Sequence, residues 1–211
     1  MSNPKPFSKK IAKYFSDISV IVIGVAITLS VSHWLSIRSE KKDLALYLNA
    51  VQLELEENLN SLNHIQQWLE PNVRYSTYVH THPRKSLNRD TLEKYRNVAY
   101  SLEQFYSFKN SAFEMFKNSG TMRLISDKDL LLLLWNVYQH LDGLNKALDW
   151  YFQIKTEELK KEFPIVFDGG TVDVPMWFFY VTGTPLLMVP PVERTISLSQ
   201  EMLEKLENLR R

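Results

Sequence analysis

The stretch that decides the fold is Ile18 to Ile37, I-S-V-I-V-I-G-V-A-I-T-L-S-V-S-H-W-L-S-I, which holds twenty residues without a formal charge. At about 1.5 Å of rise per residue, a helix of this length spans about 30 Å, the thickness of the hydrocarbon core of a bilayer. Trp34 lies where an interfacial aromatic residue is expected. The sequence therefore predicts a single transmembrane helix over residues 18–37, with these anchor positions: Ile18, Gly24, Thr28, Trp34 and Ile37.

A cleavable signal peptide is the competing interpretation, because Ser30 and Ser32 have the small-residue spacing that a signal peptidase accepts. The apolar run continues past that point through Leu35 and Ile37, and it is longer than a usual signal-peptide core. We therefore expect an uncleaved anchor. Gly24, Thr28 and Ser32 recur at every fourth residue, which is either a helix-dimerisation face or the ordinary abundance of small residues in membrane helices.

The charges on either side of the anchor predict its orientation. The tail, residues 1–17, carries Lys5, Lys9, Lys10 and Lys13, whereas Arg38, Lys41 and Lys42 follow the apolar run. By the positive-inside rule the tail stays in the cytoplasm of a bacterial cell and the rest lies in the periplasm, on a margin of one residue. We expect a single-pass protein of the inner membrane.

The composition excludes several classes of function. Its 25 basic and 24 acidic residues balance, so no overall field attracts nucleic acid. The chain has no cysteine, which excludes disulfides, thiolate nucleophiles and cysteine-based zinc sites. Its 11 Phe, 10 Tyr and 5 Trp favour a packed core over disorder.

Two heptad seams, in which apolar residues alternate at spacings of four and three, predict a mainly α fold after the anchor. No helix breaker separates the first seam from the anchor, so we expect one helix to continue from the bilayer into a bundle of residues 38–164, with the two seam helices antiparallel. The first seam spans residues 44–69 and the second residues 130–151, and their central positions are Leu48, Val51, Leu55, Asn58 and Leu62, then Leu134, Val137, Leu141, Leu144 and Leu148.

Breakers and capping residues set the expected boundaries within the bundle. Pro71 is expected to end the first helix, followed by a loop up to residue 89. A second helix is expected from Asp90 to Tyr106, and a capping box at Ser111 opens a short helix that ends at Gly120.

The residues from 165 to 195 are rich in proline and glycine and predict an irregular segment or a short β-hairpin near 165–192. Prolines 175, 185, 190 and 191 are expected to exclude a long helix there. A membrane-facing loop with Trp177 to Tyr180 at the interface is the alternative. Residues 196–211 predict a short amphipathic C-terminal helix.

Candidate chemistry is sparse. His80 and His82 are the best metal-like pair, expected on one side of an extended segment, but no third ligand is evident. Asp168 and Asp173 flank a glycine turn, and Lys117 lies two residues before Ser119, which is a poor spacing for a dyad on a helix. No phosphate loop or hydrolase motif is present. We expect no catalytic residues, no metal and no cofactor.

Two stretches together resemble a known family. They are V-I-V-I-G-V-A-I-T-L-S-V-S-H-W, followed by a charged helix with V-Q-L-E-L-E-E-N, and S-A-F-E-M-F-K-N-S-G-T-M-R-L-I-S-D-K-D-L, from Ser111 to Leu130. They resemble an uncharacterised family of small bacterial single-pass membrane proteins common in the Bacteroidota. This sequence has Ser32 before His33-Trp34 and Phe116 where that family usually has asparagine and leucine. The resemblance implies an anchor and a helical domain, and it implies no activity.

These observations lead to the expectation of a membrane-anchored helical interaction or scaffold protein of the cell envelope. It would contact the bilayer, and a protein partner or a second copy through its heptad helices. Two alternatives remain: an envelope enzyme with a site in residues 168–191, and a sensory ligand-binding bundle.

Overall fold

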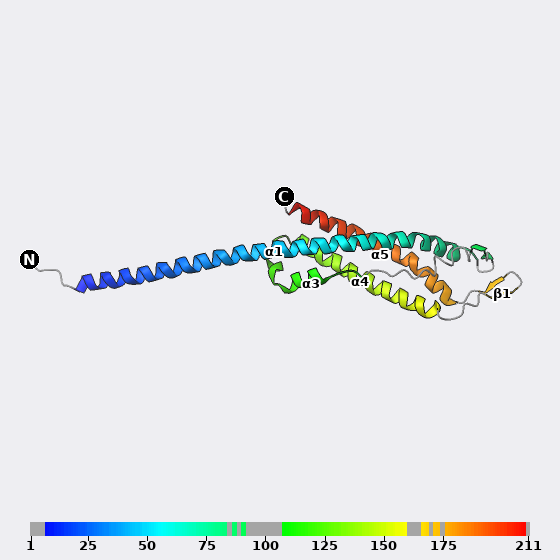
Figure 1. The fold of residues 1–211 in the computed structure, drawn as a ribbon, viewed down its shortest axis with the longest axis horizontal. Helices are drawn as coiled ribbons and strands as arrows, with labels where there is room; N and C mark the ends of the chain where they lie inside the picture. Colours follow the sequence, from blue (N-terminus) through cyan, green and yellow to red (C-terminus); the bar gives the residue numbers. More distant parts are fainter. Residues whose placement is uncertain are drawn as a thin grey trace, which may run out of the picture. The chain divides into compact units, whose positions relative to one another are not determined.

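The computed structural model describes residues 7–83, 86–87, 90–91, 107–159, 166–168, 171–173 and 176–209. The fold is mainly α, as predicted (Figure 1). Contacts divide the chain into two compact units, residues 1–46 and 47–211. In chain order the elements are α1 (Phe7–Thr81), α3 (Ser111–Asn118), the 3-10 helix η2 (Thr121–Leu124), α4 (Lys128–Leu159), β1 (Val166–Asp168), β2 (Thr171–Asp173) and α5 (Met176–Asn208).

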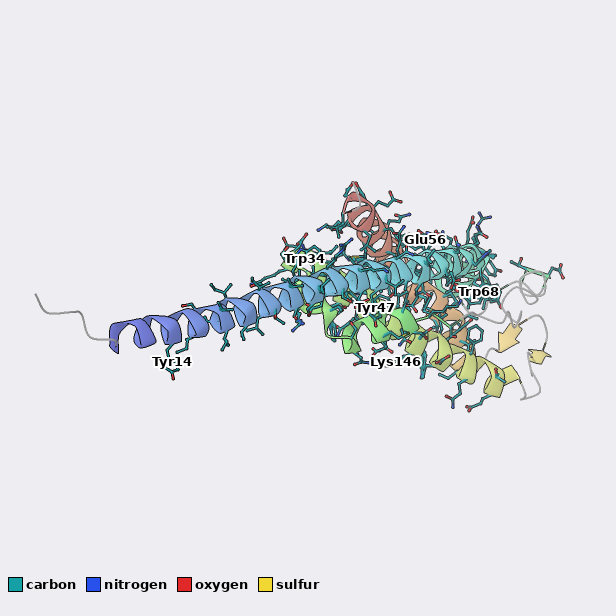
Figure 2. All side chains as sticks on the ribbon, turned by 60° about the vertical axis from the view of Figure 1, so that its left-hand side comes forward. Tyr14, Trp34, Tyr47, Glu56, Trp68 and Lys146 are labelled. Carbon is teal, nitrogen blue, oxygen red and sulfur yellow. The ribbon has the colours of Figure 1, made fainter. Side chains whose placement is uncertain are left out.

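The first unit consists of the N-terminal part of α1. Every side chain from 18 to 37 is exposed, and the apolar ones range from 40% exposed at Ile37 to 66% at Val20. Figure 2 shows Tyr14 and Trp34 on this part of the helix, 68% and 58% exposed. Among the described residues, this is the one helix long and apolar enough to cross a membrane, with a mean hydropathy of 2.0 in its most apolar window.

Two hydroxyl groups within the apolar stretch form hydrogen bonds inside the helix. Thr28 Oγ1 donates to the Gly24 carbonyl at 2.8 Å, and Ser30 Oγ donates to the Ala26 carbonyl at 2.7 Å. Because hydrocarbon offers no hydrogen-bond partner, this bonding lets polar side chains lie at bilayer depth at low cost.

The second unit is a bundle built from the C-terminal part of α1 together with α4 and α5. The seam positions are buried, and Leu48 is half-buried at the end of the seam. Trp68 on α1, labelled in Figure 2, meets Tyr151 on α4 edge to face, with ring centroids 6.0 Å apart. The α4 helix also packs closely along α5.

Helices α1 and α4 run parallel, so the antiparallel arrangement expected from the seams is wrong. Glu54 contacts Tyr138 and, further along both helices, Trp68 contacts Tyr151. Contacting residues therefore advance in the same direction on α1 and α4. A parallel pair requires the intervening chain to return to the start of the bundle, and the 46 residues between α1 and α4, 82–127, are numerous enough to do so.

Pro71 does not end the first helix, which continues through it to Thr81. Proline removes one amide hydrogen and costs about 3 kcal/mol inside a helix. The buried face nevertheless continues beyond it at Tyr75 and Val79, 2% and 0% exposed. Burial of that face outweighs the proline penalty.

The expected irregular segment is helical over most of its length. Helix α5 begins at Met176, contains Pro185, Pro190 and Pro191, and includes the expected C-terminal helix. Its buried positions are spaced at four and three residues like those of α4, so α5 contributes a third seam: Val181, Pro185, Met188, Val192, Thr195, Ser199, Met202 and Leu206. The hairpin alternative holds only for residues 166–173, where β1 and β2 pair antiparallel with Phe167 opposite Val172.

Some expectations fall outside the described parts of the chain. The predicted second helix is one of them, because residues 92–106 are not described. The side chains of Trp177, Phe178 and Tyr180 are another, which leaves the interfacial alternative for that segment without a structural description.

Candidate functional site

The buried carboxylate of Glu54 joins three elements of the bundle. Glu54 is 7% exposed and projects from α1. Its Oε2 accepts the backbone N–H of Ala112 at 2.7 Å, and its Oε1 accepts the N–H of Phe113 at 3.2 Å. The Tyr138 hydroxyl on α4 donates to the same Oε1 at 2.7 Å. Glu54 therefore caps the first turn of α3, where the helix dipole also favours a negative charge.

Two amide side chains fix the chain just before α3. Asn58 on α1 bonds Lys109 twice: its Nδ2 donates to the Lys109 carbonyl and its Oδ1 accepts the Lys109 N–H, both at 2.8 Å. Asn145 Oδ1 on α4 accepts the Phe108 N–H at 3.0 Å. The polar residue expected at a seam position, Asn58, is thus matched to backbone groups of this segment.

The expected capping box at Ser111 differs from the structure. Asn110 is the N-cap residue of α3 and makes no side-chain capping bond. Glu114 pairs with Lys117 at 2.6 Å instead of returning to the backbone. Glu54, which is distant in sequence, supplies the capping oxygens, so the local motif was replaced by a tertiary one. The expected left-handed residue after α3 is present, since Gly120 has φ of 74°.

A hollow of about 490 Å³ lies beside this network, and we call it the α3–α4 hollow. Its aromatic residues are partly stacked: Phe113 and Tyr138 lie 4.1 Å apart with 7° between their planes, and Trp135 meets Phe113 edge to face at 6.0 Å. Burial and the bond to Glu54 raise the pKa of Tyr138, so it is a neutral donor at physiological pH. The lining residues are Phe108, Lys109, Asn110, Phe113, Glu114, Lys117, Trp135, Tyr138, Gln139, Leu141, Asp142, Gly143 and Asn145.

Every charged side chain of the hollow is already paired. Lys117 binds Glu114, Asp142 binds Lys146 at 2.6 Å, and Lys109 binds Glu57. The Lys117 ammonium also lies 5.9 Å from the ring centroids of both Phe113 and Trp135. Asn110 and Gln139, by contrast, make no side-chain hydrogen bond within the described residues.

The predicted metal candidates do not form a pair. His80 lies within α1 and His82 just after it, so the extended segment expected there is wrong, and residues two apart on a helix point to different sides. His80 packs against Phe179 at 5.7 Å, and His82 Nδ1 lies 2.9 Å from the Tyr78 carbonyl. Among the described residues, no group of three or more His, Asp and Glu side chains can hold a metal ion.

The other candidates are likewise explained by local structure. Ser119 Oγ lies 2.7 Å from the Phe116 carbonyl and 2.6 Å from Thr121 Oγ1, while Lys117 binds Glu114, so the serine and the lysine are not joined. Asp168 and Asp173 lie at opposite ends of the paired strands. None of these sequence-predicted candidates therefore forms a nucleophile joined to a general base.

A second groove, more apolar than the α3–α4 hollow, lies on the surface along α4 and α5. It has a volume of about 430 Å³, and the small residues Gly143 and Ala147 lie in its wall with Met188. Trp150 and Leu187 line it as well and remain 55% and 76% exposed. We call it the α4–α5 groove.

No protein-family model, curated protein or solved structure matches the chain. The arrangement of its own residues is therefore the basis for a functional conclusion. That arrangement can bind a molecule, since it offers aromatic faces and unused hydrogen-bonding groups in an open hollow.

Glu54, Tyr138 and Trp135 were not predicted from the sequence as site residues. The only indication was position: Glu54 lies four residues before Asn58, on the same side of the helix. A surface salt-bridge residue gives the same pattern, and the heptad contains other glutamates. The partner of Glu54 becomes evident only when α3 is placed in space.

We predict that Glu54→Ala lowers the free energy of unfolding by about 2–4 kcal/mol, because it leaves two helix-terminal N–H groups and a buried hydroxyl without their acceptor. Glu57→Ala is the matched control, three residues away with a 58% exposed side chain, and should cost less than about 1 kcal/mol. Urea unfolding of the full chain measures both. Equal losses in the two variants would contradict the capping role.

A second prediction concerns alkaline pH. A tyrosine whose folded pKa exceeds its unfolded value near 10 stabilises the fold below that pH, and the stabilisation is lost as pH rises towards the folded pKa. Tyr75, Tyr138 and Tyr151 all have raised pKa values, chiefly because they are buried. Tyr138→Phe should therefore reduce the downward slope of unfolding free energy above about pH 10 by up to about 1.4 kcal/mol per pH unit. Urea titrations between pH 8 and 11 measure it, and an unchanged slope would contradict the assignment.

Proposed function

We propose that this chain is a membrane-anchored interaction protein of the bacterial cell envelope, which holds a partner beside the bilayer. The observation that carries the proposal is the contrast between the two units. The twenty residues from 18 to 37 carry no formal charge, are mostly apolar and are all exposed, whereas the apolar seams of the second unit are buried. An exposed apolar surface of that length is costly in water and favourable in hydrocarbon.

The proposed orientation places the N-terminal tail in the cytoplasm and the bundle in the periplasm. Four lysines before the apolar stretch against three basic residues after it support this direction. The proposed membrane is the inner membrane, crossed once. The resemblance to small single-pass proteins of the Bacteroidota implies an anchor of the same kind.

Binding, as opposed to catalysis, is favoured by the chemistry of the described residues. Each of their charged side chains in the α3–α4 hollow is paired with a neighbouring side chain of opposite charge. The seams are mostly used within the bundle, so the proposed protein contact lies beside them. The α4–α5 groove, with Trp150 and Leu187 exposed, offers the apolar side chains that interface centres favour.

If residues 18–37 anchor the chain, charged substitutions within this stretch should abolish its association with the membrane. Replacing both Ile23 and Ile27 by arginine should move the full chain out of the carbonate-resistant membrane fraction, since two arginines at bilayer depth cost about 5–7 kcal/mol of insertion free energy. Leu46→Arg with Leu53→Arg is the control, because those leucines are similarly exposed, 66% and 55% against 57% and 58%, but lie outside the apolar stretch. Retention of the first variant in the membrane would refute the anchor.

A partner bound in the α4–α5 groove should crosslink, in native membranes, to positions inside the groove and not to positions outside it. A photoreactive phenylalanine analogue at 150 or at 187 should give one and the same crosslinked species, identified by mass spectrometry, because both positions line the α4–α5 groove. Analogues at Glu157 and Glu201, exposed on the same two helices, are the controls and should not give it. Recovery of only the isolated monomer from both groove positions would count against a partner there.

A further inference from the structure

We propose that the α3–α4 hollow binds a neutral saccharide, whose ring stacks on the indole of Trp135 while Asn110 and Gln139 bond its hydroxyl groups. This goes beyond the proposed function, which names no small ligand. Its test uses purified protein and does not depend on the membrane or on a protein partner. A failure of one proposal therefore leaves the other testable.

The size of the hollow suits a small ligand. Its volume of about 490 Å³ lies within the range of about 300–1,000 Å³ that small-molecule sites occupy. Part of its wall is held from two helices, because Glu54 and Asn58 on α1 and Asn145 on α4 bond the backbone between Phe108 and Phe113. A site whose walls are already fixed pays less to order itself when a ligand binds.

Trp135 supplies the apolar face. It is 48% exposed although tryptophan is highly buried on average, and Phe113 packs against its ring with 6.0 Å between the ring centroids. The C–H groups on one side of a pyranose ring carry a small positive charge and pack well on the negative face of an indole. A flat, supported and accessible indole is the surface such a ring requires.

The charges of the hollow argue against an ionic ligand. Lys109, Lys117 and Asp142 each bind a neighbouring side chain of opposite charge, so an ion would have to break an existing pair. The place that a ligand cation would take against the aromatic rings is already occupied by the Lys117 ammonium, 5.9 Å from the centroid of Trp135. A neutral ligand breaks no ion pair, and it packs on the part of Trp135 that stays exposed beside that ammonium.

The amides argue for hydroxyl groups. A primary amide offers donors and an acceptor together, and a hydroxyl group both donates and accepts. Asn110 and Gln139 make no side-chain bond within the described residues, and Asn145 uses only its oxygen there, so its N–H groups stay available. A ligand with several adjacent hydroxyl groups matches this set better than an apolar one, which would leave the amides without partners.

The test is ¹⁹F NMR of the full chain labelled with 5-fluorotryptophan, in lauryldimethylamine oxide micelles, a detergent that has no sugar headgroup. The five tryptophans give separate resonances, of which those of Trp68, Trp135 and Trp150 are assigned with the Trp68→Phe, Trp135→Phe and Trp150→Phe variants. Maltose, cellobiose and N,N′-diacetylchitobiose are the probes. At least one should shift the Trp135 resonance saturably, with Kd of about 1 mM or below, and leave Trp150 unchanged.

A matched pair of variants tests the amide. Gln139→Ala should weaken the binding at least about fivefold, since it removes one or two hydrogen bonds to the ligand. Gln153→Ala is the control, an exposed glutamine on the same helix outside the hollow, and should leave Kd unchanged. An unchanged resonance from the buried Trp68 verifies that each variant is folded.

Several results would overturn the proposal. One is the absence of any saturable shift with all three disaccharides at about 20 mM, well above the expected Kd. Another is a shift of Trp135 with tetramethylammonium chloride or sodium phosphate in place of the sugars, which would identify a site for ions. Equal weakening in the two glutamine variants would also refute it.

Discussion

The bundle depends on one constraint: the first turn of α3 has to find acceptors for its N–H groups in a buried place. Glu54 meets that need from α1, and Tyr138 donates to the same carboxylate from α4. A buried carboxylate is costly unless its oxygens are bonded, and the N–H groups at a helix terminus are costly unless accepted. Each group supplies the hydrogen-bond partner that the other needs, so these bonds stabilise the packing of α1, α3 and α4 against one another.

This constraint also accounts for the parallel course of α1 and α4. A helix hairpin with a short loop would have placed the two seams antiparallel. The chain instead returns before α3, where Asn58 bonds both polar groups of Lys109 and thereby holds the returning backbone against α1. Helix α5 then runs antiparallel to α1, since His80 near the end of α1 meets Gly183 near the start of α5, while Leu69 and Val192 line one hollow further along. Direction within the bundle is therefore set by polar residues, although the apolar seams supply most of the buried surface.

The sequence predicted the helical class and the two seams, because apolar spacing reports directly which side of a helix is buried. It failed where a local rule competes with burial. Pro71 and Pro185 were expected to exclude helix, yet both lie inside one. The spacing of Val181, Met188 and Val192 nevertheless indicated the seam of α5. The free energy gained by burying that seam exceeds the penalty for proline inside a helix, and a comparison of the two would have favoured a helix. Long-range hydrogen bonds such as that of Glu54 have no periodic pattern, which is why sequence analysis did not find the hollow.

The same network shapes the chemistry of the α3–α4 hollow. The carboxylate of Glu54 accepts hydrogen bonds from α3 and from Tyr138, and Glu54 does not line the hollow. Its buried charge is therefore not presented to a ligand. The surface charges pair along their own helices or with a neighbouring one, as Asp142 does with Lys146. What remains for a ligand is the indole of Trp135 and a few amides, groups that are neutral and that change little with pH or salt. Recognition by such groups depends on shape and hydrogen-bond pattern, and a binding site of this kind would discriminate ligands by their outline and hydroxyl positions, not by their charge.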